Sequence, residues 1–154
     1  MNSYKLASVL KRGRTDVLAI HCGDYRFQAA FNEFLNRSLN LDGNYDLMVI
    51  PGGPVSLALT EHLPKFSWAS WEWLRFFVKQ HEIRRVILIQ HQDCAFYQTM
   101  PLHLHDSPEL RQRQEQDLRR ATTALRKDLP ELNVELYYAG WDPTDHIIIE
   151  TIAG

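Results

Sequence analysis

The sequence predicts an α/β fold in which a mostly parallel sheet is flanked by helices. Short apolar runs typical of buried strands alternate with longer segments whose apolar residues recur at helical spacing. This alternation is typical of parallel strands joined by helices that cover both faces of the sheet. Only a turn separates the last two predicted strands, so we expect the C-terminal strand to run antiparallel to its predecessor.

The expected elements follow one another without a linker, repeat or low-complexity tract, which favours a single domain over residues 1–154. Residues 1–15 are polar and basic and are interpreted as a short lead-in with some helical character. The predicted strands are residues 16–21, 45–50, 85–90, 134–139 and 146–152, and the predicted helices are residues 26–39, 67–81 and 108–127. Residues 40–44, 51–54 and 140–144 are rich in Gly, Pro, Asn or Asp and are expected to form turns, and residues 101–107 a loop.

Two of the predicted helices have a clear apolar face. The face of the helix 67–81 is assigned to the core or to a subunit interface, and it contains Trp68, Trp71, Leu74, Phe77 and Val78. The expected inner positions of the helix 108–127 and the residues just after it are Leu110, Leu118, Ala121, Leu125 and Leu129. The charged run 111–120 is expected to face solvent.

The composition excludes several classes of function. A net charge of −2 provides no electrostatic basis for binding nucleic acid or an anionic membrane. No apolar run approaches the ~20 residues that span a bilayer, and the N-terminus lacks the apolar stretch of a secretory signal. We therefore expect a cytoplasmic protein, in which two cysteines are more often metal ligands or reactive thiols than a disulfide.

Each of the two cysteines lies in a short run of residues suited to metal chemistry, directly after a predicted strand. The first run is Cys22-Gly23-Asp24-Tyr25-Arg26, and the second is His91-Gln92-Asp93-Cys94. Two thiolates and one imidazole suit a zinc enzyme whose fourth coordination position stays open. If the two strands are neighbours, their carboxyl ends border the crevice where α/β proteins bind ligands. The two runs could then share one zinc ion.

Asp24 and Arg26 are candidate catalytic residues beside that fourth position. Asp24 can orient a zinc-bound water, or it can bind the zinc directly and close the site. Arg26 can pair with Asp24 in a forked geometry and hold the carboxylate away from the metal. The alternative is an ordinary ion pair at the start of a helix.

Other polar residues near the two runs are assigned structural roles. His21 lies on the opposite side of its strand from Cys22 and is interpreted as a structural histidine. Asp93 is expected to be a turn or cap residue. His103, His105 and Asp106 are assigned to a solvated loop, with a second metal site or proton transfer as the alternatives.

The ordered residues Cys22, Asp24 and Arg26, followed by His91 and Cys94, resemble the β-class carbonic anhydrases over residues 16–94. This resemblance implies that Cys22, His91 and Cys94 hold zinc and that Asp24 and Arg26 form a catalytic dyad. The implied reaction is reversible hydration of CO₂ to bicarbonate by zinc-bound hydroxide. The resemblance also implies a four-stranded parallel core with an added antiparallel strand, and a homodimer or higher homo-oligomer.

Three other functions remain open for the same residues. The same nucleophile could hydrolyse COS or CS₂ instead of hydrating CO₂. The chain could be a non-catalytic zinc-binding domain of the same fold. The third possibility is a redox switch in which Cys22 and Cys94 form a disulfide without metal.

Overall fold

A computed structural model describes residues 2–60, 64–99 and 108–154. Within these ranges the chain forms one five-stranded sheet with the strand order β2-β1-β3-β4-β5. The strands are β1 (Val17–His21), β2 (Asp46–Val49), β3 (Arg85–His91), β4 (Asn133–Trp141) and β5 (Ile147–Ile152). The first four are parallel, and β5 is antiparallel to β4. The predicted fold class is therefore confirmed, including the added antiparallel strand at the C-terminus.

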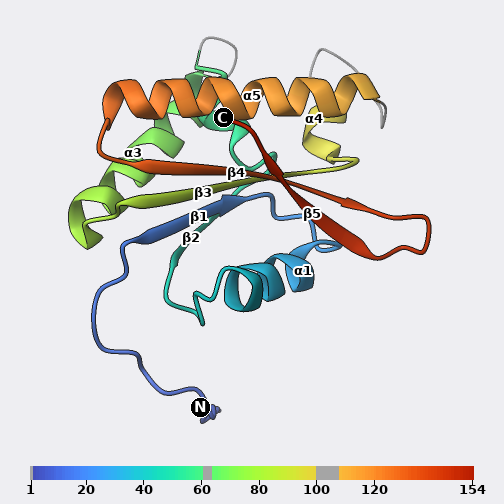
Figure 1. The fold of residues 1–154 in the computed structure, drawn as a ribbon. Helices are drawn as coiled ribbons and strands as arrows, with labels where there is room; N and C mark the ends of the chain where they lie inside the picture. Colours follow the sequence, from blue (N-terminus) through green and yellow to red (C-terminus); the bar gives the residue numbers. More distant parts are fainter. Residues whose placement is uncertain (1, 61–63, 100–107) are drawn as a thin grey trace.

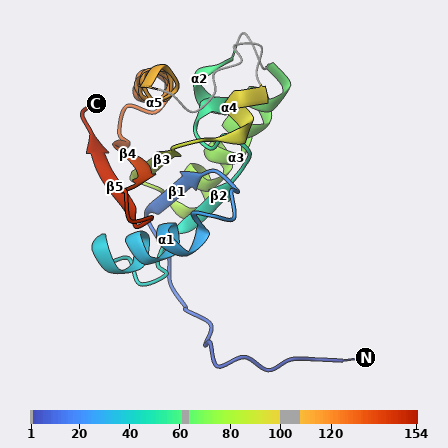
Figure 2. The same ribbon diagram turned by 90° about the vertical axis from the view of Figure 1, so that its right-hand side faces the viewer.

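Helices cover both faces of this sheet (Figure 1). On one face lies α1 (Gln28–Glu33), which continues into a π-helical turn, η1 (Phe34–Ser38). The other face is covered by α3 (Pro64–His81) and α5 (Pro108–Asp128). Two short helices, α2 (Val55–Ala58) and α4 (Ala95–Thr99), lie on the α5 side of the molecule (Figure 2). None of the helices in the described part of the chain combines the length and apolar character that crossing a membrane requires.

The alternation of side chains along β1 divides the core into two layers. Leu18 and Ile20 pack toward α3 and α5, whereas Val17 and Ala19 pack toward α1. β1 is buried along its whole length because it has a neighbouring strand on each side. The register places Ile20 opposite Leu88 of β3. The segments that follow β1 and β3 therefore emerge side by side at the same edge of the sheet.

Several expectations are corrected by the fold. Residues 2–16 form no helix and are almost entirely exposed, including the apolar side chains of Tyr4, Leu6, Val9 and Leu10. Trp68 is 69% exposed, which excludes the core and leaves the subunit interface as its assignment, whereas Trp71 and Leu74 on the same helix are buried. Trp68 lies on a face of α3 that points away from the sheet. The short helices α2 and α4 were not predicted, because four or five residues are too few to show a helical period.

The inner face of α5 is also more polar than expected. Leu110, Leu118, Ala121 and Leu125 are buried as predicted, and Leu129 is partly buried against the same core. Gln114 and Asp117, however, belong to the charged run that was expected to face solvent, and both are buried. They point inward because α5 packs against the loops and short helices at the sheet edge as well as against the sheet itself.

Candidate metal centre

The side chains of Cys22, His91 and Cys94 meet just beyond the C-terminal ends of β1 and β3. Their possible ligand atoms all lie within 4.8 Å of one another, and the two Sγ atoms are 4.0 Å apart. Two thiolates bound ~2.3 Å from one tetrahedral zinc would lie ~3.8 Å apart. All three residues are buried. The described residues contain no other group of three or more His, Cys, Asp or Glu side chains arranged in this way.

A glycine turn packs directly against the backbone of Cys22. Gly52 and Gly53 have φ values of 75° and 55°, a region in which glycine is favoured over residues with a side chain. A Cβ atom on Gly53 would lie 3.0 Å from the backbone nitrogen of Cys22. A larger residue would therefore push the turn away from the cysteine loop.

His91 is oriented for metal binding by a hydrogen bond on the far side of its ring. The backbone carbonyl of Gln92 lies 2.8 Å from Nδ1 and accepts its proton, which leaves the lone pair on Nε2. Nε2 is buried and has no hydrogen-bond partner among the described residues. The ring is also held by Phe27, whose centroid is 4.5 Å away. A buried acceptor without a partner, beside two thiols, fits a metal ligand.

The two thiols are electrostatically coupled even without a metal. The hydrogen bond from the Cys94 thiol lowers the pKa of Cys22, and the same contact, together with burial, raises the pKa of Cys94. The pair therefore favours one thiolate and one thiol, which share a proton. Binding of a divalent cation would favour the loss of this remaining proton, because thiolate is the form of cysteine that binds metals.

Arg26 holds Asp24 in the forked geometry that the sequence suggested. Arg26 Nη2 lies 2.7 Å from Asp24 Oδ2, and Arg26 Nε lies 3.1 Å from Oδ1. The backbone N–H of Arg26 also donates to Oδ1, at 3.0 Å. These hydrogen bonds lower the pKa of Asp24, so the carboxylate stays ionised through neutral and mildly acidic pH.

Arg26 ties the two metal loops together through contacts that the sequence did not reveal, and Gln28 braces the first loop. Arg26 Nη1 lies 2.8 Å from the carboxylate of Asp93, and Nη2 lies 2.9 Å from the backbone oxygen of the same residue. Gln28 donates to the backbone oxygens of Cys22 and Asp24, at 3.0 and 2.8 Å. Asp93 does occupy a turn, with φ 53°, but its partner lies 67 residues away. Neither contact has a local sequence signal.

The other candidates named from the sequence lie outside this cluster. His21 is buried against Phe31, with ring centroids 4.5 Å apart, and its Nδ1 lies 2.9 Å from the backbone oxygen of Cys22. Burial lowers the pKa of His21, so the ring is neutral at pH 7. His103, His105 and Asp106 lie outside the described residues.

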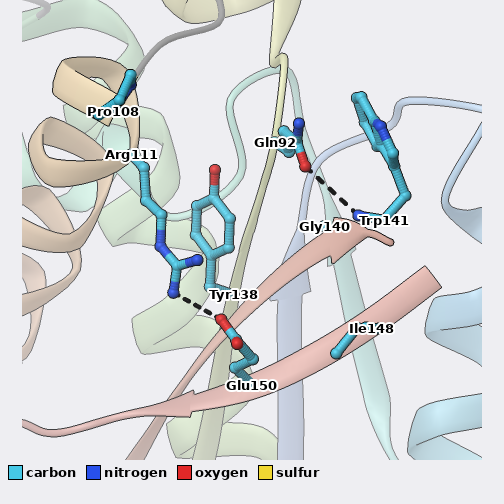
Figure 3. Close-up of a pocket in the computed structure, with 8 residues that line it drawn as sticks. All are labelled: Gln92, Pro108, Arg111, Tyr138, Gly140, Trp141, Ile148 and Glu150. Carbon is cyan, nitrogen blue, oxygen red and sulfur yellow. Dashed lines mark hydrogen bonds and ion pairs between the residues drawn. The ribbon is translucent and has the colours of Figure 1, made fainter. Parts of the chain in front are cut away.

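A hollow of about 420 Å³ lies next to the metal loop, between α5 and the strands β4 and β5 (Figure 3). Arg111 stacks over the ring of Tyr138 and pairs with Glu150, with a shortest N–O distance of 2.6 Å. None of the three clustered residues lines this hollow, although Gln92 does. We therefore assign the candidate chemistry to the buried cluster and not to this hollow.

Comparison with known proteins supports the relationship suggested by these residues. Residues 13–148 match the family model described as "Putative carbonic anhydrase". No curated protein sequence matches the chain significantly.

Two solved structures resemble the fold. The wild-type β-carbonic anhydrase CafD of the fungus Aspergillus fumigatus is 13% identical, with a TM-score of 0.53 and coverage of 97% of this chain and 95% of CafD. A cysteine-to-alanine mutant of the same enzyme is 14% identical, with a TM-score of 0.54 and coverage of 93% and 91%. At this level of identity the structures establish a shared fold, and the family model covers most of the sequence. The chain therefore belongs to this family, described as "Putative carbonic anhydrase", and its fold is that of the β-carbonic anhydrases.

Proposed function

We propose that the protein is a zinc-dependent carbonic anhydrase that catalyses the reversible hydration of CO₂ to bicarbonate. In this proposal Cys22, His91 and Cys94 bind the zinc ion, and Asp24 and Arg26 act as the catalytic dyad. The observation that carries the proposal is the buried, unpartnered Nε2 of His91, which lies within 4.8 Å of two thiol sulfurs. Family membership supports the same reaction.

Zinc in this position would supply a Lewis acid that makes water nucleophilic at neutral pH. Asp24 would orient the attacking water by accepting a hydrogen bond from it. Arg26 keeps this carboxylate ionised and fixed, because its guanidinium contacts both carboxylate oxygens. The same contacts would keep Asp24 from acting as a fourth zinc ligand.

The surroundings of the two cysteines suit a substrate with little polarity. Cys22 and Cys94 pack in one buried cluster with Val55, Leu59 and Tyr97. CO₂ offers almost nothing to hydrogen-bond, so an apolar environment does not disfavour its binding. A neutral linear molecule would also avoid the desolvation penalty that an ion meets in such a place.

Elemental analysis and stopped-flow CO₂ hydration test this function together. We expect about one zinc per chain and measurable hydration that is lost in Asp24→Asn. Stoichiometric zinc without hydration at any pH would favour a non-catalytic zinc-binding domain. Negligible CO₂ turnover with rapid COS hydrolysis would change the substrate, and a Cys22–Cys94 disulfide in metal-free, active protein would favour the redox switch.

We also propose that the protein is a homodimer formed through an apolar surface beside the metal loops. A hollow of about 410 Å³ is lined mainly by apolar residues of α3 and of the segments 50–51 and 96. Phe66 and Trp73, which line it, are 60% and 52% exposed. The neighbouring strand β2 is an edge of the sheet, and its Leu47 and Val49 are each 42% exposed.

A second copy is the proposed occupant, because an edge strand beside an apolar hollow can pair with the same elements of its twin about a two-fold axis. Analytical ultracentrifugation of Trp73→Glu should give a monomer, and unchanged zinc content would show that the metal site survives. A native protein that sediments as a monomer at micromolar concentration would contradict this assembly. One domain over residues 1–154 and a cytoplasmic location remain part of the proposal.

A further inference from the structure

A chain of buried hydrogen bonds connects α5 to the segments that carry both cysteines. Gln90 Nε2 donates to the backbone oxygen of Gly52 at 3.0 Å and to the hydroxyl oxygen of Tyr97 at 3.2 Å. The Tyr97 hydroxyl donates to Asp117 Oδ2 at 3.2 Å. Gln90, Tyr97 and Asp117 are all at most 1% exposed. Three polar side chains thus form a continuous connection inside the protein.

Asp117 is the anchor of this chain because two arginines on its own helix hold it. Arg113 Nε lies 3.0 Å from Oδ2, and Arg120 Nη1 lies 3.1 Å from Oδ1. Burial and the Asp117 charge raise the pKa of Tyr97, so its hydroxyl keeps the proton that it donates. The direction of each hydrogen bond is therefore defined: amide to hydroxyl, and hydroxyl to carboxylate.

The other end of the chain reaches both cysteine loops. Tyr97 lies in α4, its backbone N–H donates to the carbonyl of Cys94 at 3.0 Å, and its ring packs in the cluster that contains both cysteines. Gly52 belongs to the glycine turn whose next residue, Gly53, lies directly against the backbone of Cys22. One anchor on α5 therefore holds the segment after Cys94 and the turn beside Cys22.

Burying the Gln90 side chain carries a free-energy penalty that a purely structural role does not explain. Its Oε1 is buried and has no partner among the described residues, so the amide leaves one acceptor unsatisfied. A leucine would fill similar space without that penalty. The contribution of the amide is the position that its nitrogen imposes on the Gly52 turn and on Tyr97.

We propose that Asp117 is a positioning residue for the metal centre and acts through Tyr97 and Gln90 to fix the separation of the two cysteine loops. This inference rests on the proposed function, since it assumes that zinc binds between those loops. Removing the connection leaves all three ligands in place but lets the loops move relative to each other. Loss of supporting contacts outside the ligand set typically weakens metal binding about 10- to 100-fold.

The test is Tyr97→Phe in the full chain, which keeps the ring and removes only the hydroxyl. We expect zinc to transfer to a chromogenic chelator about 10-fold faster than from the native protein. The visible absorption bands of the cobalt-substituted variant should shift, because those bands report ligand geometry. Gln90→Met interrupts the same series of hydrogen bonds on the other side of Tyr97 and should give the same two changes.

Thr122→Ala is the matched control. Thr122 is a buried polar residue of α5. Its hydroxyl donates to the carbonyl of Leu118 at 2.9 Å and takes no part in the hydrogen bonds that link Asp117, Tyr97 and Gln90. The control should lower the thermal midpoint of the metal-free protein without changing the zinc transfer rate or the cobalt spectrum. If Tyr97→Phe does not fold, Gln90→Met supplies the same comparison.

The outcomes separate this inference from the proposed function. A native protein that binds no zinc overturns the proposed function. If native protein binds zinc but Tyr97→Phe and Gln90→Met show native transfer rates and native cobalt spectra, the positioning role is wrong and the zinc site stands. A rise in transfer rate in Thr122→Ala as large as in the two test variants would also overturn it, because the rate would then follow thermal stability alone.

Discussion

Two forked arginine–carboxylate pairs lie at opposite ends of the parallel strands. Arg85 pairs with Glu135 near the start of β3 and β4, with N–O distances of 2.6 and 3.0 Å. Arg26 pairs with Asp24 beyond the end of β1, at 2.7 and 3.1 Å. The arginine lowers the pKa of the carboxyl in both pairs. Pair geometry and charge are therefore nearly the same at the two ends.

The difference lies in what each pair connects. Arg85 lies on β3 and Glu135 on β4, so this pair fastens one strand to its neighbour. Glu135 also accepts a hydrogen bond at 2.8 Å from the hydroxyl of Tyr137 on its own strand. Arg26 also binds Asp93, and so it joins the loop of Cys22 to the loop of His91 and Cys94. Because ligand sites of α/β sheets form at the carboxyl ends of strands, we expect the same chemistry to serve stability at one end and catalysis at the other.

The largest effect is expected from removing a thiolate at the proposed catalytic end. Cys22→Ser and Cys94→Ser replace a charged ligand with a neutral hydroxyl, so zinc content should fall to near zero and CO₂ hydration with it. Elemental analysis after dialysis measures this. Serine variants that retain full zinc would show that the sulfurs are not ligands, and the comparison of the two ends would lose its basis.

Asp24→Asn should have the next largest effect, on rate and not on metal content. The amide keeps the shape of the side chain but is a weaker acceptor and cannot pair ionically with Arg26. We expect kcat to fall about 100-fold or more while zinc stays bound. Parallel measurement of zinc and hydration rate decides the point. Loss of zinc as complete as in the cysteine variants would instead make Asp24 a ligand.

The two arginines give the direct comparison. Arg26→Lys should lower kcat about 10-fold, because lysine cannot contact both Asp24 oxygens and Asp93 at once. Arg85→Lys is the matched substitution at the other end and should leave kcat and KM unchanged while slightly lowering the thermal midpoint. Equal losses of kcat in the two variants would mean that the position of the pair does not matter.

Glu135→Gln is expected to have the smallest effect. At pH 7 it should reduce the free energy of unfolding by about 1 kcal/mol, with no change in rate. The folded-state pKa of Glu135 is lowered, so its contribution is present above the ordinary carboxyl pKa and is lost as pH falls through the lowered value. Urea unfolding of both proteins should therefore converge in strongly acidic buffer. A difference that persists there would point to packing rather than charge.

Most of the fold could be predicted from local patterns. The runs 17–20 and 86–89 are continuous and apolar, and helical spacing marked α1, α3 and α5. Spacing could not decide between core and subunit interface for Trp68, because it does not show which face of a helix reaches the sheet. The same limit applies to Asp117, whose arginine neighbours in sequence suggested a solvated face.

The sequence by itself determined the strands, the helices and the residues that carry the candidate chemistry, because apolar periodicity, turn residues and the two short motifs are all local properties. Only the tertiary structure decided that Arg26 reaches Asp93, that Nε2 of His91 is left without a partner among the described residues, and that Asp117 connects to the cysteine loops through Tyr97. These contacts depend on the register of β1 against β3 and on the packing of α5 over the strand ends. Such distances between remote segments have no counterpart in the periodicity of the sequence.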